Sequence, residues 1–102
     1  MSSTQSTNEA VAEKKRLSTP KKYMVIFLND NVTPMEYVIQ LLLTFFGKTT
    51  EEANEITLEV HEKGRCIVGT YSYEVAEQKC IETVTDARKH NYPLDVVMEE
   101  SA

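Results

Sequence analysis

A run of six apolar residues, YMVIFL at 23–28, constrains the fold more than any other part of this sequence. The run is rich in β-branched and aromatic residues and shows almost no alternation with polar ones, which is typical of a strand buried on both faces. It ends at Asn29, Asp30 and Asn31, residues whose side chains bond to nearby backbone in turns. The run therefore predicts a buried strand that ends in a polar turn.

Two helices with their own start and stop signals follow this turn. The first is predicted from a capping box at 33–36, TPME, with Thr33 as the N-cap, and it runs to about Phe46. The second is predicted from another capping box at 49–52, TTEE, and ends at Gly64. Apolar residues recur at helical spacing in both segments, so each helix has one apolar face.

The remainder of the chain predicts a strand, a helix and a last strand. The segment RCIVGTY at 65–71 reads as a strand, and LDVVM at 94–98 follows the helix-breaking Pro93. Between them a third helix begins near Ser72, and its inner stripe is expected to be Val75, Ala76, Cys80, Val84 and Ala87. The resulting order is β-α-α-β-α-β. We therefore expect an α+β fold in which a three-stranded antiparallel sheet packs against three helices.

The beginning of the chain differs in composition from the rest. Residues 1–21 are rich in Ser, Thr, Gln, Asn and Glu and contain no aromatic residue, which predicts a flexible N-terminal extension. Residues 22–102 are enough for one small domain. Residues 1–22 carry a net charge of +3, so the total of −5 leaves −8 for residues 23–102. An acidic body repels a phosphate backbone, so we expect no nucleic-acid partner and a better fit to a cationic ligand.

Several classes of protein are disfavoured by what the sequence lacks. It has no apolar run of about 18 residues and no apolar stretch after a basic start, so neither a membrane span nor a secretory signal is predicted. Cys66 and Cys80 lie on apolar stripes without a metal-like spacing, and we interpret them as reduced core residues. The familiar catalytic motifs are also missing. We expect a cytoplasmic protein without a cofactor, a metal or an enzymatic activity.

A polar cluster beside an apolar one is the candidate ligand site. Met35 and Val38 share a face of the first helix, and Thr57, Val60 and His61 share a face of the second. If the two helices pack as a hairpin, these faces oppose each other. They would then enclose a small apolar pit with amide oxygens and an imidazole at its mouth, which suits a large apolar group next to a positive charge.

Each of these residues also has a purely structural interpretation. Asn29 and Asn31 could serve only the turn, and His61 could bond to the carbonyls at the end of its helix, where the dipole favours it. Met35 and Val38 could be ordinary core residues. Composition and spacing leave both interpretations open.

Three segments of the chain closely resemble the ClpS adaptor family. They are NDNVTPMEYVIQLLLTFF at 29–46, LEVHEKGRCIVGTYSYEVAEQK at 58–79 and YPLDVVME at 92–99, and the match extends over roughly residues 22–100. The resemblance implies the fold predicted above. It also implies a monomeric adaptor that binds the first residue of N-degron substrates, typically Leu, Phe, Tyr or Trp, and docks on the N-domain of ClpA or ClpC for degradation by ClpP. A bacterial cytosol or a plastid stroma would both fit such a protein.

The resemblance also assigns roles to residues. The expected contacts to the substrate α-ammonium are Asn29, Asn31 and His61, with Asp30 beside them. The expected lining of the side-chain pocket is Thr33, Met35, Val38, Thr57, Val60 and Leu94. The expected contacts to the chaperone N-domain are Glu74 and Lys79.

Two positions depart from the family pattern. The family usually has Asp where this chain has Asn31, whose amide oxygen accepts a hydrogen bond without charge assistance. The family often has Met where this chain has Thr57, and this shorter polar residue should enlarge or wet the pit and favour Tyr or Trp over Leu. These departures keep an alternative function open, an interaction module that docks on the Clp chaperone and modulates it without selecting N-termini.

Overall fold

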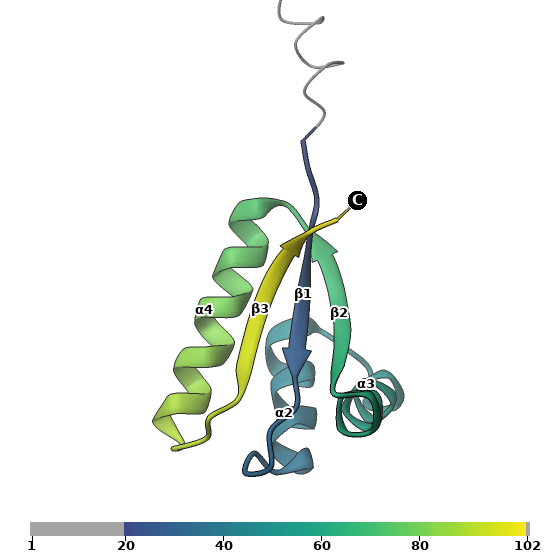
Figure 1. Ribbon diagram of the computed structural model, residues 1–102, viewed down its shortest axis with the longest axis vertical. Helices are drawn as coiled ribbons and strands as arrows, with labels where there is room; N and C mark the ends of the chain where they lie inside the picture. Colours follow the sequence, from purple (N-terminus) through teal and green to yellow (C-terminus); the bar gives the residue numbers. More distant parts are fainter. Residues whose placement is uncertain (1–19, 102) are drawn as a thin grey trace, which may run out of the picture.

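The predicted order of elements is confirmed by a computed structural model, which describes residues 20–101 (Figure 1). The elements are β1 (Tyr23–Leu28), α2 (Met35–Phe46), α3 (Thr50–Lys63), β2 (Arg65–Tyr71), α4 (Tyr73–Lys89) and β3 (Asp95–Glu100). The extension predicted at residues 1–21 lies almost entirely outside the described residues.

The three strands form one antiparallel sheet in the order β2-β1-β3. Tyr23 is paired with Tyr71 and Glu100, and at the other end of β1 Leu28 is paired with Arg65 and Asp95. The helices pack against one face of this sheet, with α4 alongside β3 and with α2 and α3 near the end of β1 where the polar turn begins (Figure 1). The α+β architecture expected from the sequence is therefore the one observed.

The central position of β1 explains its unbroken apolar sequence. Val25, Ile26 and Phe27 are consecutive and each is fully buried, although their side chains point alternately to the two faces of the sheet. Val25 and Phe27 belong to the helix-covered core. Arg65 of β2 and Glu99 of β3 form an ion pair at 3.3 Å, which bridges the two edge strands across β1.

The start of α3 follows the sequence prediction. The Thr49 hydroxyl accepts a hydrogen bond from the Glu52 amide at 3.1 Å, and the Glu52 carboxylate accepts one from the Thr49 amide at 2.9 Å. These bonds hold the pKa of Glu52 below its usual value, and the bond from the Thr49 backbone amide has the larger effect. At its other end α3 stops at Gly64, which has a φ of 88° that glycine adopts without strain.

The predicted capping box at the start of α2 is wrong. The helix begins at Met35, with Pro34 as the N-cap residue and no side chain capping it. The Thr33 amide and hydroxyl both donate instead to the carboxylate of Asp30, at 2.7 Å each. A hydrogen bond to a charged oxygen is the stronger one, so Thr33 is held by the turn rather than by the helix.

Two smaller expectations also need correction. Ala76, Thr83 and Ala87 form the buried stripe of α4, and Val75, expected on that stripe, is 44% exposed. Val75 lies one residue, or roughly 100° of helix rotation, away from the stripe. The last strand begins one residue later than predicted and continues to Glu100, because β1 offers pairing partners along its whole length.

Candidate functional site

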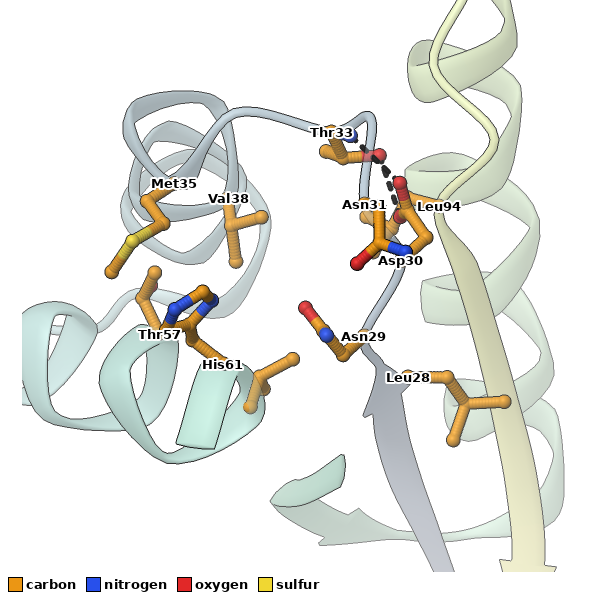
Figure 2. A pocket seen from close by; sticks show the side chains of 11 residues that line it. Leu28, Asn29, Asp30, Asn31, Thr33, Met35, Val38, Thr57, His61 and Leu94 are labelled. Atoms are coloured by element: carbon orange, nitrogen blue, oxygen red, sulfur yellow. Dashed lines mark hydrogen bonds between the residues drawn. The ribbon is translucent and has the colours of Figure 1, made fainter. Parts of the chain in front are cut away.

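A cavity of about 180 Å³ opens between the loop that follows β1, the start of α2 and the second half of α3 (Figure 2). Its lining contains all ten residues that the sequence led us to expect at a ligand site, together with Leu28: Asn29, Asp30, Asn31, Thr33, Met35, Val38, Thr57, Val60, His61 and Leu94. Leu28 was not expected there, although its position directly before Asn29 at the end of a strand was a signal for it.

The cavity exists because α2 and α3 form a hairpin. α2 ends at Gly47, whose φ of 59° lies in the left-handed region and lets the chain reverse within a short link. The face of α2 that carries Met35 and Val38 then lies opposite the face of α3 that carries Thr57 and His61 (Figure 2). The hairpin on which the predicted site depends is therefore present.

The apolar part of the cavity is deep and its rim is exposed. Val38, Thr57, Val60 and Leu94 are all buried, with exposed fractions of 5% or less. Met35 is 41% exposed and lies at the mouth. The buried residues form the inner wall of the cavity, while Met35 can shield a group that enters from solvent.

The polar mouth is formed by side chains from two directions. Figure 2 shows the amide oxygens of Asn29 and Asn31 and the ring of His61 around the same opening. All three residues are exposed, and within residues 20–101 none of their side chains has a hydrogen-bond partner. His61 thus does not serve the carbonyls at the end of α3, where the Gly64 amide donates to the Val60 carbonyl. These polar groups remain available to a ligand.

Asp30 organises the loop rather than the opening. Its carboxylate accepts hydrogen bonds from the Val32 amide at 2.8 Å and from the Thr33 amide and hydroxyl, and Figure 2 shows it turned toward Thr33. Partial burial acts to raise the pKa of Asp30, but the hydrogen bonds from Thr33 and Val32 outweigh it and lower the pKa. The loop is also tied to α3, because the Asn29 amide donates to the Gly64 carbonyl at 2.9 Å.

Replacing Asp30 by alanine should lower the free energy of unfolding by about 0.5–2 kcal/mol at neutral pH, because the carboxylate accepts hydrogen bonds from two backbone amides in the turn much as an N-cap side chain does in a helix. The pKa of Asp30 is lower in the folded state, so its contribution is present above the pKa of an unfolded Asp, about 3.9. That contribution is lost as the pH falls through the folded-state pKa. Urea denaturation at pH 6 and at progressively lower pH should show the difference between the proteins shrinking.

The Asn31→Ala variant is the matched control, since the side chain of Asn31 makes no hydrogen bond in the described part of the chain. Its unfolding free energy should equal that of the wild type at both ends of the pH range. A pH-independent loss in the Asp30→Ala variant would contradict the role given to the carboxylate.

The two residues expected to contact a chaperone lie outside the cavity, on α4. Glu74 is exposed in the first turn of the helix. Lys79 is half-buried: its ammonium donates to the Phe45 carbonyl at 2.5 Å and lies 5.5 Å from the centre of the Phe46 ring. Lys79 therefore stabilises the C-terminal end of α2, a role that the sequence did not indicate.

Neither Cys66 nor Cys80 has the lowered pKa of an activated thiol. Burial, followed by the hydrogen bond and charge of Glu59, raises the pKa of Cys66 to about 11, and burial also raises the pKa of Cys80. A thiol with a raised pKa is a poor nucleophile.

In the part of the chain that the structure describes, no three His, Cys, Asp or Glu side chains gather as a metal site would require. The same residues contain no helix with the length and apolar character of a membrane span.

The fold and the cavity together define a small α+β domain whose apolar pocket opens beside polar groups that have no partner among residues 20–101. Residues 18–97 match the model of the family described as "ATP-dependent Clp protease adaptor protein ClpS". The chain belongs to the ClpS family.

Relatives and a solved structure agree with this assignment. The ClpS adapter protein of Bdellovibrio bacteriovorus is 47% identical over 87 residues, which cover 85% of this chain and 76% of that protein. The ClpS adapter protein of Caulobacter vibrioides is 44% identical over 87 residues, or 85% of this chain and 80% of that protein. The structure of Agrobacterium tumefaciens ClpS2 bound to L-phenylalaninamide superimposes with a TM-score of 0.79 at 28% identity, covering 80% of this chain and 99% of that one.

Proposed function

We propose that this protein binds the N-terminal residue of N-degron substrates, a bulky Leu, Phe, Tyr or Trp, and delivers them to a ClpA- or ClpC-type AAA+ unfoldase for degradation by ClpP. One observation carries the proposal: a buried apolar cavity opens directly beside exposed side-chain acceptors, from Asn29, Asn31 and His61, that have no partner in the described residues. An N-terminal residue is a large side chain attached to an ammonium, and it matches both parts of this site.

The ligand of the related ClpS2 supports the same chemistry. L-phenylalaninamide combines a free α-amine, a phenyl side chain and an amide in place of the next peptide bond, so it resembles the first residue of a polypeptide. The domain of this chain is acidic, with a net charge of −8 over residues 23–102, which favours the approach of a positively charged chain start.

The energies of such a complex are sufficient. Burial of one large apolar side chain contributes about 1.5–3 kcal/mol, and each hydrogen bond from a charged amine contributes on the order of 1.5–3 kcal/mol. With two or three such bonds, and after the cost of ordering the peptide, the total reaches the roughly −8 kcal/mol of a micromolar complex. That affinity suits an adaptor, which must also release its cargo.

In this function the protein performs no catalytic step, and the unfoldase and its peptidase carry out the reaction. Glu74 on the exposed start of α4 would contact the N-domain of the unfoldase, together with Lys79 five residues further along the same helix. The relatives found are bacterial, so the proposed location is a bacterial cytosol.

Peptides that differ only in their first residue test the proposal. Fluorescence anisotropy titrations with Leu, Phe, Trp and Arg at that position should give binding for the first three and at least about a tenfold weaker affinity for Arg, whose charge would lie in the apolar cavity. Equal or absent binding across the four peptides would instead favour an interaction module that docks on the unfoldase without selecting N-termini.

A further inference from the structure

Within residues 20–101, the hydroxyl of Thr57 is the only buried side-chain polar atom without a hydrogen-bond partner. Thr57 is 2% exposed and lines the cavity, where Figure 2 shows its side chain between α3 and Met35 of α2. A buried polar group without a partner costs free energy, and native proteins rarely retain one without a reason. The position of this group in the cavity lining suggests that reason.

A second buried threonine in the described part of the chain shows that the fold can satisfy such a group. Thr83 of α4 is fully buried, and its hydroxyl donates to the Lys79 carbonyl at 2.6 Å and lies 3.2 Å from the Cys80 carbonyl. Bonding to a carbonyl about one turn back is the usual solution for threonine in a helix. The Thr57 hydroxyl does not form this bond, so no group within residues 20–101 competes for it with a ligand in the cavity.

The place of Thr57 along α3 sets how far that group lies from the mouth. Thr57 precedes His61 by four residues, which is about 6 Å along the helix axis. An aromatic side chain whose ammonium lies at the mouth, near Asn29 and His61, would therefore bring the far end of its ring to the level of Thr57. The apolar residues Val38 and Val60, both buried, line the same cavity.

We infer that the Thr57 hydroxyl selects an N-terminal tyrosine, by a hydrogen bond to the phenol at the inner end of the cavity. This inference rests on the proposed function and refines its substrate preference. The cavity has the necessary size: it measures about 180 Å³, and an engineered cavity of roughly 150 Å³ holds benzene. Phenylalanine would fill the same space without forming this hydrogen bond, so its binding would lack the free energy that the bond gives to tyrosine.

The test measures dissociation constants of Tyr- and Phe-initiated peptides of otherwise identical sequence, with the wild type and the Thr57→Val and Thr57→Ser variants. The wild type should bind the Tyr peptide about three- to tenfold more tightly than the Phe peptide, the range expected for one neutral hydrogen bond. Thr57→Val keeps the shape and removes the hydroxyl, so the Tyr preference should disappear. Thr57→Ser keeps the hydroxyl and should preserve it.

A Tyr-to-Phe ratio that is the same in the wild type and in Thr57→Val would overturn the inference while leaving the proposed function intact. Failure of both peptides to bind, or binding equal to that of their acetylated forms, would defeat the proposed function and the inference together. Thermal unfolding of each variant without peptide provides the folding control. Thr57→Val should be at least as stable as the wild type, because a methyl group replaces an unpaired buried hydroxyl.

Discussion

Acetylation of the amino group of a Phe-initiated peptide should weaken its binding to this protein by at least about a hundredfold. The modification removes the positive charge and leaves a single N–H donor, while Asn29, Asn31 and His61 at the mouth present several acceptors. Acceptors that lose contact with water and gain no donor oppose binding by several kcal/mol. Anisotropy titrations of the free and acetylated peptides measure the ratio directly.

Further peptides and variants show whether acetylation acts by removing the contact between the peptide ammonium and the acceptors at the mouth of the cavity. Addition of Met before the Phe restores a free amine but moves the phenyl group one residue away from it, so this peptide should also fail to bind. Asn29→Ala should reduce the ratio between free and acetylated peptides. Asn54→Ala, an exposed substitution on α3 away from the cavity, should preserve that ratio. Equal affinities of the free and acetylated peptides would exclude recognition of an ammonium.

Replacement of Phe27 by alanine should cost about 3–5 kcal/mol of unfolding free energy, the usual effect of deleting a buried aromatic ring. Phe27 is fully buried in the central strand, and its ring packs edge-on against Phe46 with the ring centres 5.5 Å apart. Small domains have only about 5–15 kcal/mol of stability, so the variant should lose a large share of it and unfold at a lower temperature and urea concentration than the wild type. Urea and thermal denaturation monitored by circular dichroism would measure the loss.

The site should be lost together with the core, because Asn29 follows Phe27 by two residues and is anchored to the end of α3. Peptide binding by Phe27→Ala should therefore fall in proportion to the unfolded fraction. Phe45→Ala is the matched control: Phe45 is only half-buried on α2, and its removal should cost clearly less. An equal loss in both variants would contradict the view that the sheet centre supports the site.

The elements of the fold could be predicted because their signals are local. The unbroken run at 23–28 matches a strand with neighbours on both sides, in which Val25, Ile26 and Phe27 are fully buried. The capping box at 49–52 forms as its residue types indicate. The same holds for the shared helix face of Thr57 and His61, since four residues bring two side chains to one side of any α-helix. Helix geometry alone determined that these residues would face one direction.

Hydrogen-bond partners could not be predicted in the same way, because several candidates compete and three-dimensional distance decides among them. Thr33 had the sequence of an N-cap, but the carboxylate of Asp30 holds its amide and hydroxyl in the turn. Lys79 had the sequence of a surface residue, but the Phe45 carbonyl lies within its reach when α2 and α4 pack together.

The sequence by itself determined the strands, the helices and the faces on which the candidate site residues lie, since these depend on neighbours a few positions apart. Only the tertiary structure decided that the faces of α2 and α3 close around a cavity and that the acceptors at its mouth find no partner among residues 20–101. It also decided that Thr57, unlike Thr83, keeps a buried hydroxyl without a partner in the same residues. These properties depend on which groups the folded chain brings within about 3 Å of each other. The spacing of residues along the sequence does not specify those distances.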